Sequence, residues 1–150
     1  NEAENYCKWN KKRIPTLKEW ELAAYTEFRP NNKDGYKFKK SYPYPTGENT
    51  LGLNCFNDCN FNYPSKYSKF LLRGYGHVST FSTKKGINGL YDMGGNVWEW
   101  VDINDNSYKG TKGGSWWYGK NQMIQGYNAT KPKNMSAVYI GFRCVKDFKN

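Results

Sequence analysis

Residues 31–85 form a long segment in which apolar side chains repeat at neither helical nor strand spacing. The segment is rich in Asn, Lys, Tyr, Gly and Pro, which favour turns and irregular structure. Compact domains rarely carry so much loop without bound cations, disulfides or a binding surface. The sequence therefore predicts a loop-rich fold, and the remaining residues offer all three of these explanations.

The core of such a fold has to be built largely from rings. Only 37% of the residues are hydrophobic and the mean hydropathy is −0.96, yet 18% are aromatic and 15 are Gly. Disordered chains lack this aromatic content, and each buried Trp or Tyr removes about 150 Å² or more from water. A chain of 150 residues is long enough for one domain and too short for two. We expect a single domain over residues 1–150.

Helices are indicated near the start of the chain and strands only after residue 90. A short helix ends at about Trp9, and a second helix begins at the capping box of Thr16 and Glu19 and ends before Arg29. Candidate strands follow at 97–101, around 114–117, weakly near 124, and at 137–144. Helices first and short antiparallel strands later indicate an α+β fold.

The net charge of +10 comes from 23 basic and 13 acidic residues, and 19 of the basic ones are Lys. Nucleic-acid binders use arginine forks and clustered basic stripes, whereas these lysines are scattered. We therefore expect a solvated lysine-rich surface and no nucleic acid, although an acidic partner stays open. No apolar run approaches the roughly 20 residues of a membrane span.

Residues 87–101 read INGLYDMGGNVWEWV. They resemble the signature of the formylglycine-generating-enzyme (sulfatase-modifying-factor) family, G-L-Y-D-M-x-G-N-V-W-E-W. Weaker motifs agree in the same order: Y-C-x-W at Tyr6, K-R-I-P-T-x-x-E-W-E at Lys12, Y-P-x-G at Tyr44, G-G-S-W at Gly113 and G-F-R-C at Gly141. The resemblance implies a C-type-lectin-like fold with little regular secondary structure. It also implies that the chain corresponds to the C-terminal two-thirds of a complete domain and lacks the family's N-terminal segment.

Four cysteines allow three pairings. The resemblance selects Cys7–Cys144, which would close a loop worth about 4–5 kcal/mol in the chain-entropy model. Cys55 and Cys59 then remain as a local pair. The alternatives for these two are half a zinc site, a redox pair or free thiols, although zinc needs about four ligands and the only histidine is His77. Disulfides indicate a periplasmic, cell-surface or secreted protein.

The same resemblance implies a calcium site in the segment that follows Leu90. Side chains of Asp92 and Glu99 and carbonyls of Gly95 and Val97 would bind the ion, and such oxygen ligands suit a hard cation. The alternative is that both carboxylates only accept hydrogen bonds from loop amides. A second calcium site would start at Asn54, but the position expected to supply its carboxylate falls near Ser68.

Oxidases of the family bind copper through two cysteines of a G-G-S-x-x-C-x-x-x-x-C stretch, because Cu(I) prefers thiolates. Those positions hold Tyr118 and Met123 here, so we expect no copper and no formylglycine-forming activity. The related sulfoxide synthases bind iron through several histidines, and a single histidine cannot build that site. We interpret His77 as a hydrogen-bonding loop residue.

The segment after Gly114 lines a peptide-binding groove in the family's enzymes. The residues expected to line the groove here are Ser115, Trp116, Trp117, Tyr118, Tyr127 and Asn128. Exposed rings interleaved with Asn and Ser make adaptable contacts. The alternative is that some of these rings belong to the core, as we expect for Trp98 and Trp100.

Three functions follow from this sequence. The first is an exported, calcium-stabilised module without oxidase chemistry that acts as a peptide-binding or protein-binding domain or as an accessory subunit of a larger complex. The second is a divergent protein-modifying oxidase. The third is a ligand-binding protein diversified by a retroelement within residues 116–140. The sequence does not identify the partner or the oligomeric state.

Overall fold

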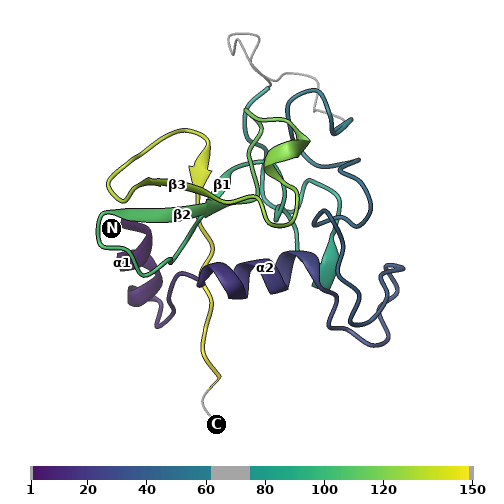
Figure 1. Cartoon of the computed structure of the whole chain (residues 1–150), viewed down its shortest axis with the longest axis horizontal. Helices are drawn as coiled ribbons and strands as arrows, with labels where there is room; N and C mark the ends of the chain where they lie inside the picture. The colour runs from purple at the N-terminus through teal and green to yellow at the C-terminus, as the bar shows by residue number, and fades with distance from the viewer. Residues whose placement is uncertain (1, 62–74, 149–150) are drawn as a thin grey trace.

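The computed structural model describes residues 2–61 and 75–148. Two helices come first, α1 (Glu2–Trp9) and α2 (Leu17–Tyr25). The later elements are the short 3-10 turns η1 (Ile87–Gly89) and η2 (Lys120–Gln122) and the strands β1 (Trp98–Val101), β2 (Tyr108–Lys112), β3 (Ala129–Pro132) and β4 (Ile140–Gly141). Between α2 and η1 the described residues form loops joined by isolated bridges (Figure 1). The predicted loop-rich α+β architecture is confirmed.

The second helix begins where its capping box predicts. The Glu19 amide donates to the Thr16 hydroxyl (3.3 Å), and the Glu19 carboxylate accepts from the Thr16 amide (2.8 Å). The helix ends at Tyr25, earlier than the predicted end before Arg29. It ends there because Thr26 adopts an extended backbone and forms a bridge with Ser41.

The four strands form one sheet in the order β3-β2-β1-β4. β1 pairs antiparallel with β2, and β2 with β3. The prediction of antiparallel strands fails for β4, which lies parallel to β1 with Trp98 opposite Ile140. β3 and β4 lie at opposite edges of the sheet and both run in the direction of β1. Residues 133–139, which connect them, therefore cross from one edge of the sheet to the other (Figure 1).

Two of the predicted strands were wrong and two observed strands were missed. The 114–117 candidate is no strand because Gly113 and Gly114 have φ of 89° and 70°, a left-handed bend that ends β2. Ile124 lies in a bend after η2. The missed strands β2 and β3 read YKGTK and ATKP, without the apolar alternation that would indicate a strand.

The core has two clusters. In the first, α2 lies below the sheet in Figure 1 and buries Trp20, Ala24 and Tyr25 against Met93 and Val101. The second joins Leu53, Cys55, Cys59 and Met123. Large rings therefore supply much of the buried volume, as the composition predicts.

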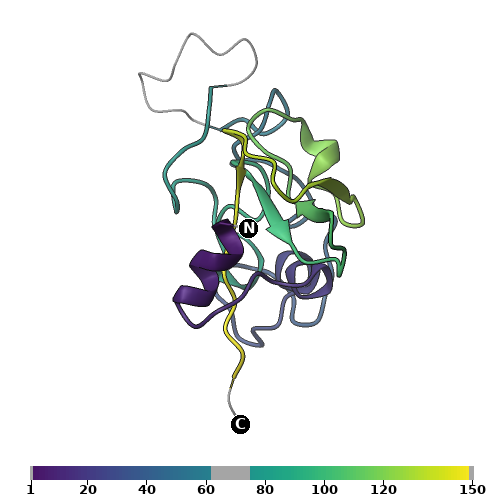
Figure 2. The same ribbon diagram turned by 90° about the vertical axis from the view of Figure 1, so that its left-hand side faces the viewer.

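Both predicted disulfides are confirmed. Cys7 is bonded to Cys144 and Cys55 to Cys59, each with a Cα–Cα distance of 5.5 Å. Next to the first bond, Arg13 forms an antiparallel bridge with Val145. The C-terminal segment therefore runs beside the start of the chain in both views (Figures 1 and 2). None of the described helices has the length and apolar character needed to cross a lipid bilayer.

Candidate functional site

The turn between η1 and β1 carries the residues predicted to bind calcium. Asp92, Gly95 and Asn96 have positive φ of 59°, 70° and 59°. Gly95 is needed at its position because a Cβ there would lie 2.3 Å from the carbonyl oxygen of Asn54. The Asn96 amide donates to the same oxygen at 2.7 Å. These contacts fix a tight turn with Asp92 near its start and Glu99 just beyond its end.

A cavity of about 390 Å³ lies against this turn. Its charged lining residues are Asp92, Glu99 and Arg143, and its large apolar ones are Phe81, Leu90, Tyr91, Val97 and Phe142. The buried Glu99 carboxylate accepts from Nε and Nη2 of Arg143, both at 2.6 Å, and from Trp20 Nε1 at 2.7 Å. Asp92 accepts from the Thr83 hydroxyl (2.8 Å) and the Phe81 amide (3.2 Å).

The charges in this cavity do not cancel. Burial alone would lower the pKa of Arg143, but the charges of Glu99 and Asp92 outweigh it and raise the pKa, so the guanidinium stays protonated. Two carboxylates therefore face one cation. Among the described residues no cation forms a direct ion pair with Asp92, which accepts hydrogen bonds from a hydroxyl and an amide. The formal charges of Asp92, Glu99 and Arg143, the charged residues of this lining, sum to minus one.

The structure brings three of the four predicted calcium ligands to one cavity: Asp92, Val97 and Glu99 line it, while Gly95 lies in the turn beside it. Hard oxygen donors of this kind suit calcium, which would have to share the Glu99 carboxylate with Arg143. Arg143 was missed as part of this site, and its only signal is the G-F-R-C motif.

The predicted second calcium position is Asn54, whose side-chain amide donates to the Gly76 carbonyl (3.0 Å) and to Asn96 Oδ1 (3.3 Å). Asn54 thus stabilises the turn between η1 and β1. Ser68, near which the second site's carboxylate would have to fall, lies outside the described residues.

The two positions that hold copper-binding cysteines in the family's oxidases are packed into the protein. Met123 is fully buried against the Cys55–Cys59 disulfide, and its carbonyl accepts from the Tyr25 hydroxyl (2.8 Å). The Tyr118 ring lies edge-on to Trp98 with centroids 5.4 Å apart. All four cysteines of the chain form disulfides, so no thiolate is free. Within residues 2–61 and 75–148, no three His, Cys, Asp or Glu side chains gather as a metal site.

The six residues predicted to line a groove differ in burial. Ser115 and Trp116 are buried, and Trp116 has 1% of its surface exposed, so these two contribute to the core. Trp117 and Tyr118 are partly exposed, and Tyr127 and Asn128 are exposed. Four of the six therefore reach the surface.

The rings at this place form a continuous series, the aromatic run, made of Trp117, Tyr139, Tyr118, Trp98 and Tyr127. Successive centroids in that order are 6.1, 6.0, 5.4 and 6.2 Å apart. Trp98 is buried beneath the others, as expected. Tyr139 was missed because it lies far along the chain from the other rings. The run offers a preformed, partly exposed aromatic surface.

A buried lysine supports the end of this run. Lys112 is 1% exposed, and its Nζ donates to Glu21 (2.9 Å), to Asn128 Oδ1 (3.1 Å) and to the Tyr127 carbonyl. Burial lowers the pKa of Lys112, while Glu21 opposes that effect. Sequence reasoning missed Lys112, because a lysine in YKGTK has the pattern of a surface residue.

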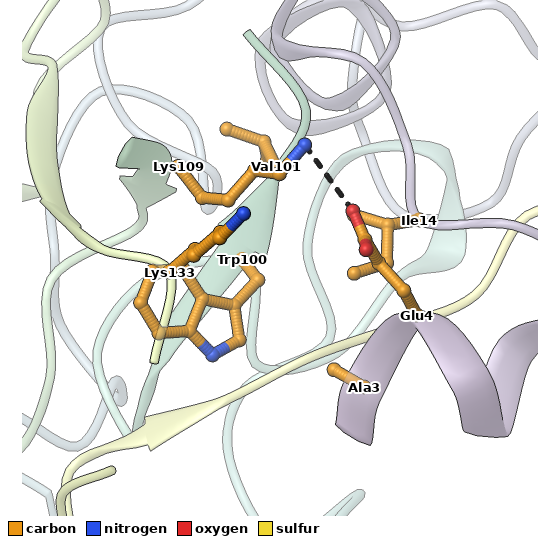
Figure 3. A pocket seen from close by; sticks show the side chains of 7 residues that line it. All are labelled: Ala3, Glu4, Ile14, Trp100, Val101, Lys109 and Lys133. Carbon is orange, nitrogen blue, oxygen red and sulfur yellow. Dashed lines mark ion pairs between the residues drawn. The ribbon is translucent and has the colours of Figure 1, made fainter. Parts of the chain in front are cut away.

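A smaller hollow between α1 and the sheet is no ligand site. Its lining residues are Ala3, Glu4, Ile14, Trp100, Val101, Lys109 and Lys133 (Figure 3). Glu4 and Lys109 form an ion pair at 3.2 Å, and Lys109 also pairs with Asp102 at 2.8 Å. The free volume is about 10 Å³, room for one water at most. The ion pair attaches α1 to the sheet.

Comparison with known families decides where this chain belongs. The sequence profile described as "Sulfatase-modifying factor enzyme 1-like domain" matches residues 1–148. The chain is a member of that family. This sulfatase-modifying-factor domain therefore contains the turn between η1 and β1, the Cys7–Cys144 bond and the two early helices.

The relatives include one protein that is named as an inactive enzyme and one that is named as an enzyme without that qualification. Inactive C-alpha-formylglycine-generating enzyme 2 of Bos taurus is 33% identical over 121 residues, which cover 77% of this chain and 36% of that protein. Formylglycine-generating enzyme of Mus musculus is 28% identical over 168 aligned positions, which cover 98% of this chain and 42% of that protein. The chain thus spans less than half the length of these relatives.

The crystal structure of CarF has a similar fold. It matches with a TM-score of 0.62 and 24% identity over 92% of this chain and 48% of CarF. At this identity the match concerns the fold alone.

Proposed function

We propose that this chain is a binding or accessory module of the sulfatase-modifying-factor family and does not perform the family's oxidase reaction. The observation that carries the proposal is the state of its sulfur atoms. All four cysteines form disulfides, and Met123 is a thioether within an apolar cluster. Cu(I) prefers soft thiolate ligands, and one buried thioether beside a tyrosine does not replace two of them. Similarity to a relative named as inactive supports the same conclusion.

The aromatic run is the surface we assign to the partner, a peptide or protein segment. Tyr and Trp provide large contact areas at low entropic cost, and they are enriched among residues that dominate binding energy. Asn128 adds an exposed amide at the end of the run, and Lys112 holds that end in place from below. This arrangement is preformed, which lowers the cost of binding.

We assign calcium to the cavity beside the η1–β1 turn, on the carboxylates of Asp92 and Glu99 and the carbonyls of Gly95 and Val97. The net negative charge there and the hard oxygen donors support this assignment. A bound ion would supply positive charge that fastens the turn.

Addition of calcium, but not of sodium, should raise Tm in wild type and not in Asp92→Asn, whereas Asp105→Asn should respond like wild type. A Tm that ignores calcium would refute the assignment.

The two disulfides favour an oxidising compartment, and we place the protein in the periplasm, at the cell surface or outside the cell. There it would act alone or within a larger exported complex.

Copper titration and peptide binding test the function. Copper should not bind stoichiometrically, and a cysteine-containing peptide should cause no oxygen consumption. Selection from a displayed peptide library should yield ligands that lose affinity at least tenfold with Trp117→Ala, as for a dominant aromatic contact. Phe28→Ala, which removes an exposed ring elsewhere, should bind normally. Stoichiometric copper with turnover would establish the divergent oxidase instead.

The diversified-protein hypothesis has one structural observation in its favour. Four of the five rings in the aromatic run lie within residues 116–140. A near-identical template repeat beside the gene would support diversification of that segment, and its absence would argue for a fixed partner.

A further inference from the structure

One face of the molecule, formed by α1 and the segment after β4, carries three exposed rings. Trp9 is 79% exposed, Tyr6 54% and Phe142 39%. The Tyr6 ring contacts both others, with centroids 6.1 Å from Trp9 and 5.5 Å from Phe142. These three residues are called the α1 face. Nothing within residues 2–61 and 75–148 covers these rings, and connected exposed apolar areas of this kind mark interaction sites.

The α1 face is held rigidly. Cys7 is buried and bonded to Cys144, and helical spacing places Trp9 on the opposite side of α1. The Glu4–Lys109 ion pair fastens the first turn of the helix to the sheet (Figure 3). The rings are thus presented outward on a fixed backbone.

Four exposed lysines lie close in sequence to the residues of the α1 face. Arg13 forms ion pairs with both Glu19 (2.6 Å) and Asp147 (2.6 Å), so these two carboxylates are already paired. In the described part of the chain no carboxylate pairs with any of the four exposed lysines of this region, Lys8, Lys11, Lys12 and Lys146. The Arg13–Val145 bridge brings Lys12 and Lys146 to neighbouring positions. The exposed carboxylate of Glu2, which lines a hollow together with Phe142, opposes these charges, so the region carries four lysines against one carboxylate outside the ion pairs named above.

We propose that the α1 face docks onto an anionic phospholipid surface. Trp and Tyr rings settle at the level of lipid headgroups, and lysines are drawn to acidic lipids. Protein–protein interfaces, by contrast, are depleted in Lys and enriched in Arg. The overall charge of +10 adds long-range attraction to an acidic membrane. The proposal does not depend on the aromatic run, whose residues belong to other segments.

Co-sedimentation of the chain with vesicles tests this docking. Vesicles of phosphatidylglycerol and phosphatidylcholine should bind the protein, and phosphatidylcholine alone should bind it far more weakly. Salt should reduce binding by screening. Trp9→Ala should weaken binding about tenfold through lost burial of the ring. Lys11→Gln with Lys12→Gln should weaken it about thirtyfold, since each lysine near an acidic surface contributes roughly fivefold.

Matched variants elsewhere serve as controls. Phe38→Ala removes an exposed ring and should bind vesicles like wild type. Lys37→Gln with Lys39→Gln lowers the overall charge by the same two units as the lysine variant of the α1 face, and it should weaken binding far less. Trp117→Ala should also bind vesicles normally, which separates this proposal from the function proposed above. Equal binding to both vesicle types, or unchanged binding by Trp9→Ala, would overturn the proposal. A Trp9-dependent dimer without vesicle binding would assign the face to a second copy of the chain and overturn it as well.

Discussion

Glu27 is a carboxylate with no exposed surface, and its partners explain how it stays charged. Nε and Nη2 of Arg29 donate to it at 2.9 and 2.8 Å, and the backbone amides of Arg29 and Asn88 donate at 2.8 and 3.1 Å. Arg29 also pairs with Asp34. The Arg29 bonds, which outweigh the opposing effect of burial, hold the pKa of Glu27 below its ordinary value. One residue thus connects the end of α2 to η1.

Glu27→Gln should lower the free energy of unfolding by about 2–3 kcal/mol at pH 7, less than for a fully buried pair because Arg29 is partly exposed. Because the folded-state pKa is depressed, this stabilisation is complete above the unfolded pKa of about 4.3 and is lost as pH falls through the folded value. Urea denaturation between pH 7 and pH 3 measures both effects. The variant should lose less stability on acidification than wild type. Glu48→Gln, in an exposed pair, should change stability by at most about 0.5 kcal/mol.

Lys112→Met should loosen the end of the aromatic run. The substitution keeps an apolar stem but removes the donor shared by Glu21, Asn128 and the Tyr127 carbonyl. Amide hydrogen exchange should become faster at residues 126–129, with β1 unchanged. Lys120→Met, at an exposed lysine in η2, provides the matched control. Equal protection of 126–129 in Lys112→Met and wild type would show that the lysine does not position this segment.

At the scale of elements, α2 is the part that its own sequence determines best. The capping box satisfies two backbone amides, and Arg13 bonds to Glu19 through Nη1 (2.7 Å) and Nη2 (2.6 Å). The bond to Arg13 is the main reason that the pKa of Glu19 falls to about 2. The N-terminus of α2 is therefore defined by Thr16 and Glu19, which lie within one turn of it, and by Arg13, which precedes the helix.

Thr16→Ala should cost about 1 kcal/mol of unfolding free energy, the usual value for a lost N-cap. The midpoint of urea denaturation measures it. Lys18→Ala, at an exposed position in the same helix, should leave the midpoint nearly unchanged. Equal effects of the two substitutions would mean that the cap does not stabilise α2 in this protein.

The sequence predicted those elements and site residues whose signals are local. The capping box located α2, and the apolar and aromatic residues of 97–101 located β1. The strands β2 and β3 were missed because their pairing with neighbouring strands stabilises them and their side-chain pattern does not indicate a strand. Asp92 and Glu99 could be named together because one motif contains both, and the structure places both in the lining of one cavity. Arg143 and Lys112 escaped because their partners are distant in sequence, so that only the fold shows them together.

On the scale of the whole molecule, the two disulfides act over very different loops. Cys7–Cys144 spans 137 positions and Cys55–Cys59 spans 4. In the chain-entropy model a longer closed loop restricts the unfolded chain more. The first bond therefore contributes more to overall stability, and the second shapes the local surroundings of Met123.

Replacing Cys7 and Cys144 by Ser should lower unfolding free energy by about 5 kcal/mol, and replacing Cys55 and Cys59 by about 2 kcal/mol. Thermal and urea denaturation of the two double variants, compared under oxidising conditions, checks the difference. Wild type in a thiol reductant should resemble the quadruple variant. A larger loss from the short loop would contradict the entropic account.

The position of the Cys7–Cys144 bond also has a mechanical consequence. With these Cα atoms 5.5 Å apart, a pulling force that enters before Cys7 and leaves after Cys144 passes through the sulfur atoms and bypasses the polypeptide between them. Stretching in that direction would extend almost nothing while the bond is intact. Only a reductant would expose the sheet and its loops to tension.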